Sequence, residues 1–70
     1  MINEFWSYGS GYYKFFSTDK TIIKRLLSLS GAIKSGLYLD SHLGFLGRDI
    51  IIPSNRLMIA KKLSGAVHIN

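Results

Sequence analysis

The segment that most constrains how this chain can fold is AIKSGLYLDSHLGFLGRDIII, residues 32 to 52. Its first part, residues 32 to 40, alternates between apolar and polar side chains. That alternation is typical of a strand with one face buried and one face in water. Strict alternation puts Ile33, Leu37 and Leu39 on one face, and Lys34, Tyr38 and Asp40 on the other.

A turn and a second strand complete this hairpin. Residues 40 to 44, DSHLG, begin with a turn-forming Asp and end with Gly44, which tolerates a positive φ. Residues 45 to 52 then predict the return strand. Pro53 ends it because proline has no backbone N–H to donate. Gly47, in the middle of this strand, indicates a bulge or a close backbone approach.

The N-terminal segment is rich in aromatic residues and predicts a second hairpin. Residues 2 to 8 and residues 12 to 17 are two aromatic runs separated by Gly9-Ser10-Gly11. Such a spacing is typical of two strands joined by a short loop. Both faces of the second strand carry aromatic side chains. It is therefore either covered on both sides or displays one aromatic face to a partner.

Residues 20 to 30 predict the first helix, because their apolar residues recur with the helical period. Ser17, Thr18 and Asp19 offer caps before it, and Gly31 suits the position after its end. The apolar arc holds Ile22, Ile23, Leu26, Leu27 and Leu29, and the opposite arc holds Lys20, Thr21, Lys24, Arg25 and Ser28.

A second, shorter helix is expected over residues 55 to 64, capped by Ser54 and ended by Gly65. Its pattern is less regular, and such a short helix must be held by packing. The remaining tail either extends a sheet edge or frays. Ile59, Ala60 and Leu63 cluster on one side of this helix, whereas Leu57 and Met58 lie off it.

These elements define an α+β fold in β(β)-α-β-β-α order over residues 1 to 70. We expect an antiparallel sheet of three to four strands with both short helices on one face. A chain this small has little core to spare, and with no cysteine it has no disulfide to support it. We therefore expect a homodimer that hides exposed apolar side chains. The expected interface residues are Trp6 and Tyr8 of the aromatic segment and Leu57 and Met58 of the second helix.

The charge balance points to an anionic partner. The net charge is +5, and the isoelectric point is near 9.8. No apolar stretch is long enough to span a membrane, and the N-terminus lacks the features of a signal peptide. We therefore expect a cytoplasmic protein with no membrane partner and, as the leading hypothesis, nucleic acid as its ligand. The predicted contacts are Lys14, Lys20, Lys24, Arg25 and Lys34 to phosphates, with Tyr12 or Tyr13 as stacking groups.

Two limited resemblances bear on this hypothesis. The run GYYKFF resembles the aromatic strand motif of RNA-recognition domains, although the leading basic residue and the second glycine are missing. The order of a helix, a hairpin and a helix is similar to that of small double-stranded-RNA-binding-like folds, including compact toxin ribonucleases. Those toxins use a strand histidine, and no predicted strand of this chain has one. The likeness concerns shape only and implies no family.

The alternatives come from other classes of protein. One is a protein-binding inhibitor or adaptor of the type that phages and mobile elements encode, acting through exposed aromatic or apolar side chains. A less favoured one is a hydrolase in which Asp40 and Asp49 hold Mg²⁺. His42 and His68 have no metal-ligand spacing. We therefore predict no catalytic residue, no metal and no cofactor.

Overall fold

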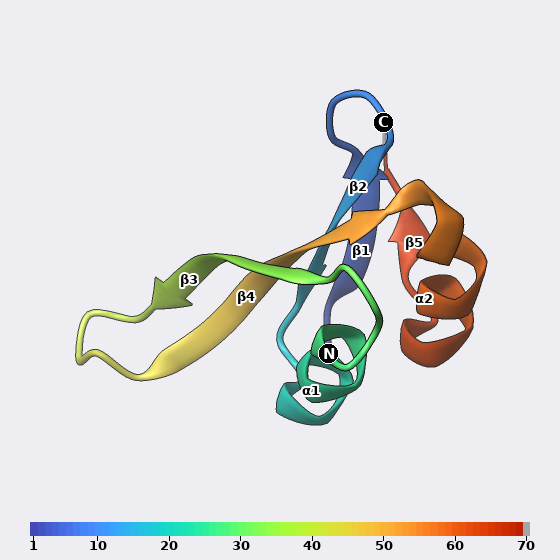
Figure 1. The fold of residues 1–70 in the computed structure, drawn as a ribbon. Coiled ribbons are helices and arrows are strands. Elements are labelled where there is room, and N and C mark those ends of the chain that lie inside the picture. Colours follow the sequence, from blue (N-terminus) through green and yellow to red (C-terminus); the bar gives the residue numbers. More distant parts are fainter. Residues whose placement is uncertain (70) are drawn as a thin grey trace.

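The computed structural model describes residues 1–69, which form a five-stranded sheet with two helices packed against one of its faces (Figure 1). The strands lie in the order β3-β4-β2-β1-β5, and only the β1–β5 pair is parallel. The predicted α+β class is confirmed, with the C-terminal tail supplying the additional strand. The elements are β1 (Asn3–Ser7), β2 (Tyr12–Ser17), α1 (Lys20–Leu27), β3 (Ile33–Leu39), β4 (Phe45–Pro53), the 3₁₀ turn η1 (Ser54–Arg56), α2 (Leu57–Ser64) and β5 (Val67–His68).

The N-terminal hairpin forms as predicted, because the loop between its strands has glycines where the backbone needs them. Gly9 and Gly11 have φ values of 67° and 82°, which glycine adopts without steric cost. Phe5 pairs with Phe15 across the hairpin, and their rings stack with centroids 4.9 Å apart. Both rings are buried beneath the helices, so this hairpin supplies the centre of the core.

Helix α1 begins where the sequence predicts but ends earlier. Asp19 is its cap: the Oδ1 atom accepts hydrogen bonds from the backbone N–H groups of Thr21 and Ile22. The helix ends at Leu27 instead of residue 30. The Ser28 hydroxyl donates to the Arg25 carbonyl at 2.6 Å, so the side chain competes for the backbone acceptors of the last turn.

The central hairpin is confirmed as two strands, but the predicted faces of β3 are wrong. A register shift between Lys34 and Leu37 adds a bulge residue to β3. Ile33 is paired with Ile51, whereas Leu37 is paired with Arg48, which lies on the opposite face of β4. The bulge therefore separates Ile33 from Leu37, because one extra residue inverts the alternation that follows it.

The turn of this hairpin uses its residues differently from the prediction. The residue with positive φ is Leu43, at 63°, and not Gly44. The Asp40 carboxylate accepts hydrogen bonds from the backbone N–H groups of His42 and Gly44. A Cβ at position 44 would lie 2.6 Å from Asp40 Oδ2, so the glycine allows this close approach instead of supplying the positive φ.

Gly47 confirms the predicted close approach within β4. A Cβ at this position would lie 2.5 Å from Cζ of Phe16 and 2.9 Å from the carbonyl oxygen of Ser17. A second register shift, between Tyr38 and Leu39, adds an extra residue to β4 beside it. The glycine therefore lets the ring of Phe16 cross over the neighbouring strand.

Helix α2 differs from the prediction at its start and in the side that it buries. Ser54 is not the cap of α2, because it begins the 3₁₀ turn and the cap position of α2 is held by Arg56. The end at Gly65 is confirmed, with a φ of 62°. The buried side holds Ala60 and Ser64, whereas Ile59 is exposed. A small residue at position 60 lets the helix backbone approach the sheet closely.

The two faces of the sheet are therefore unequal. The helix-covered face joins Phe15 and Ile50 to Leu26 of α1 and Ala60 of α2 in one buried cluster. We call the other face the open face, because neither helix covers it. One row of this face runs across four paired strands and holds Trp6, Lys14, Ile51 and Ile33.

Candidate nucleic-acid interface

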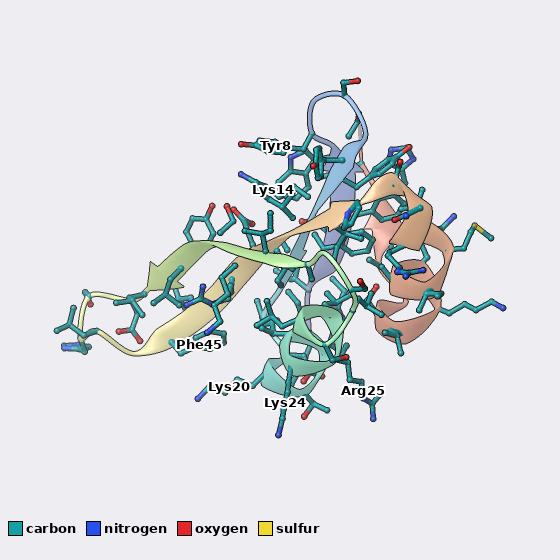
Figure 2. The ribbon with its side chains drawn as sticks, viewed as in Figure 1. Tyr8, Lys14, Lys20, Lys24, Arg25 and Phe45 are labelled. Carbon is teal, nitrogen blue, oxygen red and sulfur yellow. The ribbon has the colours of Figure 1, made fainter. Side chains whose placement is uncertain are left out.

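The basic side chains are concentrated on the helix side of the sheet. Lys20, Lys24 and Arg25 are exposed on α1. The side chains of Lys24 and Arg25 point away from the sheet, whereas the Lys20 Nζ lies 5.1 Å from the centre of the Phe45 ring of β4 (Figure 2). Lys34 is exposed and paired with Ile50, a position that faces the helices. The structure thus brings four of the five predicted phosphate contacts to one side. The other cations of this side are Arg48 at a strand position facing the helices, Arg56 in η1, and Lys61 and Lys62 in α2.

We call the two helices and the cations on their side of the sheet the helix layer. Most acidic residues lie elsewhere, so this layer is strongly positive. Asp19 is the carboxylate of the layer, and it is occupied as the cap of α1. Glu4 and Asp49 lie on the open face, paired in register with Phe16 of β2. Asp40 lies in the turn of the central hairpin. Few negative charges therefore offset the cations of the two helices.

Lys14 is separated from the other predicted phosphate contacts. It lies on the open face with its Nζ 4.0 Å from Asp49 Oδ2 and 4.3 Å from the centre of the Tyr8 ring. Figure 2 shows Lys14 and Tyr8 on the opposite side of the molecule from Lys24 and Arg25. With 18% of its side chain exposed, Lys14 is engaged inside the protein and does not join the helix layer.

Asp49 is the centre of a polar cluster that sequence reasoning missed. Its side chain is 4% exposed, and Oδ2 accepts a hydrogen bond from the Tyr38 hydroxyl at 2.6 Å. Three effects raise the pKa of the Tyr38 hydroxyl above its ordinary value. In order of size they are this hydrogen bond, the negative charge of the carboxylate, and burial. Asp49 Oδ1 has no hydrogen-bond partner among the described residues. Two glycines mark this crowded region in the sequence. A Cβ at Gly36 would contact Asp49 and Tyr38, and a Cβ at Gly47 would contact the neighbouring ring of Phe16.

The two candidate stacking residues have different environments. Tyr12 lies on the open face and is 44% exposed. Tyr13 faces the helices and packs edge-on against Phe5, with ring centroids 6.1 Å apart. Tyr13 is therefore partly buried against the core, and Tyr12 is the more exposed of the two rings.

The predicted interface residues are also divided between the two sides. Trp6 is half-buried on the open face, and Tyr8 is exposed in the loop that leaves β1. Leu57 packs against the core, whereas Met58 is exposed on α2. The structure does not bring these four side chains together.

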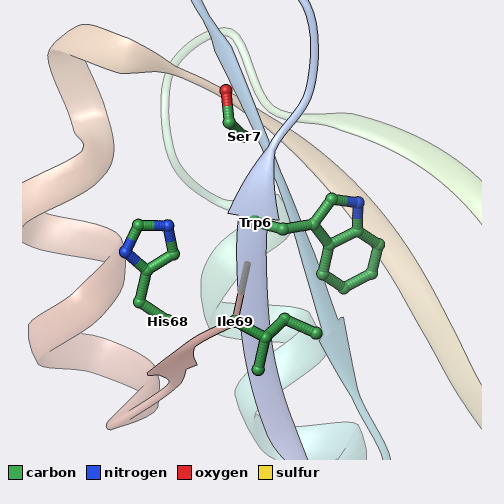
Figure 3. Close-up of a pocket in the computed structure, with 4 residues that line it drawn as sticks. All are labelled: Trp6, Ser7, His68 and Ile69. Carbon is green, nitrogen blue, oxygen red and sulfur yellow. The ribbon is translucent and has the colours of Figure 1, made fainter.

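A shallow cavity of about 400 Å³ lies where β5 joins the sheet (Figure 3). Its walls are Trp6, Ser7, His68 and Ile69, and they are mostly apolar. The imidazole of His68 stacks on the ring of Phe5 with centroids 4.6 Å apart. His68 therefore packs as an aromatic side chain against the core.

The hydrolase hypothesis gains no geometric support from the residues that the structure describes. Asp40 is used within its own turn, and Asp49 is bonded to Tyr38. Within residues 1–69 no three side chains of His, Asp or Glu are grouped closely enough to hold a metal ion. Neither of the helices in this part of the chain is long and apolar enough to cross a membrane.

Compared with known proteins, the chain matches no family model, and neither the curated proteins nor the solved structures give a match. The functional argument therefore depends on the fold and on the distribution of side chains described above.

Proposed function

We propose that this is a small, non-enzymatic protein that binds nucleic acid through phosphate contacts made by its helix layer. The observation that carries the proposal is the separation of charge between the two sides of the sheet. Lys20, Lys24 and Arg25 of α1 are exposed, and Lys34 lies on the same side of the sheet. A single solvated helix commonly carries two or three lysines. Here, in contrast, a whole layer is basic and its carboxylate is already used as a cap.

The arrangement favours the phosphate backbone over the bases. Lysine and arginine that neutralise phosphates release counterions, and this term does not depend on sequence. The exposed ring of Tyr12 is on the opposite face, so a strand lying on the helix layer would not stack on it. We therefore expect the protein to bind a duplex at least as well as a single strand.

The test measures binding to generic duplex and single-stranded oligonucleotides at about 50 mM and about 200 mM salt. Each phosphate contact to duplex DNA contributes about 0.9 to the slope of log K against log salt concentration. The double variant Lys24→Ser/Arg25→Ser should therefore lower that slope by about 1.8. The matched control is Ser10→Glu/Ser41→Glu, which makes the same change of net charge in the two hairpin loops.

The control should keep a slope closer to that of the wild type. Equal losses in the two variants would mean that net charge alone, and not the helix layer, governs binding. No binding by the wild type at the lower salt concentration would refute the nucleic-acid proposal. The serine variants, including Lys20→Ser, should fold normally, because exposed substitutions usually change the free energy of unfolding by only about 0.5 kcal/mol each.

The second candidate function is a protein-binding inhibitor or adaptor, of the type that phages and mobile elements encode. It is favoured by the exposed rings of Tyr8 and Tyr12 and by the exposed leucines of the β3–β4 hairpin. In either case we propose a homodimer, because so small a protein exposes many large apolar side chains. A cytoplasmic location is part of the same proposal, since nucleic acid is met inside the cell.

A further inference from the structure

The outer half of the β3–β4 hairpin extends away from the rest of the molecule (Figure 1). We call residues 37 to 46 the arm. The molecule measures 37 × 22 × 20 Å, and the arm accounts for its long axis in the figure. Two strands alone are marginally stable in water, so an arm of this kind needs support on its free sides. Phe45 of the arm packs against the core, but five other large side chains are exposed by between 43% and 79%; they are Leu37, Tyr38, Leu39, Leu43 and Leu46.

Strand β3 is also an edge strand, because the sheet order begins with it and β4 is its one neighbour within residues 1–69. Its inner half is poorly suited to pair with another strand. The bulge disrupts the ladder there, and the Ser35 carbonyl oxygen already accepts a hydrogen bond from Arg48 Nη1 at 3.3 Å. Its outer half, from Leu37 to Leu39, has no charged residue and no proline. Natural proteins usually protect exposed edges with such residues, so the outer half resembles a surface that is covered in use.

The charge of the arm argues against nucleic acid as the occupant. Between Lys34 and Arg48 the sequence has no Lys or Arg, one acidic residue, Asp40, and one histidine, His42. The arm is therefore apolar with a negative tip, on a protein whose net charge is +5. The outer half of β3 therefore brings no cation to a contact between two copies; Lys20, over the Phe45 ring, and Arg48, paired with Leu37, lie on the side of β4.

The residues of the outer half are self-complementary in one register. If two β3 strands pair antiparallel about a two-fold axis at Tyr38, Leu37 of each copy lies opposite Leu39 of the other. Leu37 and Leu39 are on the same face of the strand, so the four leucines form one apolar cluster. No charged side chain then lies opposite its own copy, and each Lys34 lies four positions from the axis.

We propose that the outer half of β3 is the homodimer interface, where a second copy of this chain pairs with Leu37–Leu39 and joins the two sheets into one. The inference rests on the proposed homodimer and names its surface. At roughly 200 Å² for a large side chain, the exposed fractions of Leu37, Tyr38 and Leu39 supply about 270 Å² per copy, and all five exposed side chains of the arm supply at most about 500 Å². A total of at most about 1,000 Å² is at the low end for a specific interface, so we expect a dissociation constant in the micromolar range.

The first test is the mass in solution, by light scattering at concentrations of tens to hundreds of micromolar. The wild type should give about twice 7.9 kDa, and Leu37→Lys/Leu39→Lys should give 7.9 kDa. The matched control is Met58→Lys/Ile59→Lys, which adds the same charge at two exposed apolar positions of α2. This control should remain a dimer. Circular dichroism would establish that each variant is folded.

The outcomes separate the homodimer from its surface. A monomeric wild type would refute both. A dimer lost only in the α2 variant would keep the homodimer and move its interface to α2. A dimer retained in both variants, or lost equally in both, would also overturn the assignment to β3.

The second test fixes the register, and it is simple because the chain has no cysteine. Opposite residues of antiparallel strands have Cα atoms about 4.5–5.5 Å apart, which a disulfide can span. Under mild oxidation by oxidised glutathione, a mixture of Leu37→Cys and Leu39→Cys proteins should cross-link to a covalent heterodimer. Either protein alone should cross-link far less, because identical positions are offset along the strands by more than a disulfide reaches. Equal cross-linking of the single variants would refute this register.

Discussion

The ion pair between Lys14 and Asp49 provides the sharpest test of how the open face is organised. Lys14→Met keeps much of the side-chain volume but removes the ammonium group that lies 4.0 Å from Asp49 Oδ2. The Asp49 side chain is 4% exposed, and its Oδ1 has no partner among the described residues. The variant therefore leaves a buried carboxylate whose remaining support is the hydroxyl of Tyr38.

The expected magnitude follows from the distance. Two unit charges about 4 Å apart attract by about 4 kcal/mol at an effective dielectric constant of about 20. Removing one partner of a buried pair typically costs about 3–5 kcal/mol. Because 18% of the Lys14 side chain is exposed, water screens part of this attraction. We therefore expect Lys14→Met to lower the free energy of unfolding by about 3 kcal/mol.

The assay is urea unfolding of a double-mutant cycle at neutral pH and one fixed protein concentration. Asp49→Asn removes the buried charge, so the double variant Lys14→Met/Asp49→Asn should be more stable than the sum of the single effects allows. We expect a coupling energy of about 2 kcal/mol. Lys24→Met is the matched control and should change stability by less than about 0.5 kcal/mol, because Lys24 is exposed. Additive effects in the cycle, or a Lys14→Met protein as stable as that control, would refute the reasoning.

Three further predictions concern the core, the alkaline limit of stability and the crossing of the strands. Leu26→Ala should lower the free energy of unfolding by about 2–5 kcal/mol in denaturant titrations, because Leu26 is fully buried in the core. The hydrogen bond to Asp49 raises the pKa of Tyr38 above 10.0, so its stabilisation is complete below pH 10.0 and is lost as the pH rises through the raised pKa. Thermal melts should therefore show wild-type stability falling in that alkaline range, and Tyr38→Phe should remove this part of the fall; an unchanged pH profile would contradict the assignment. Gly47→Ala should cost about 1–3 kcal/mol in the same melts, because its Cβ would force the Phe16 ring to move.

Local signals in the sequence were enough to predict most of the secondary structure. Both hairpins form where alternation, aromatic runs and glycine loops place them. The cap at Asp19 and the end of α2 at Gly65 were also predictable, because each depends on one residue and its immediate neighbours. The start of α2 was not, since the sequence pattern does not distinguish a helix capped at Ser54 from a 3₁₀ turn before a helix that begins at Leu57.

The composition of the candidate interface was decided by tertiary structure. Periodicity predicts which residues share a face of one strand or helix, but it does not say which face of the sheet the helices will cover. Lys14 and Lys20 are close in sequence, yet α1 packs on the side of β2 opposite to Lys14, which therefore pairs with Asp49. Likewise, because of a single bulge in β3, Ile33 lies on the open face and Leu37 lies on the helix-covered face. Both outcomes depend on contacts between segments distant in the sequence, where buried apolar area and strand register outweigh the preference of any one residue.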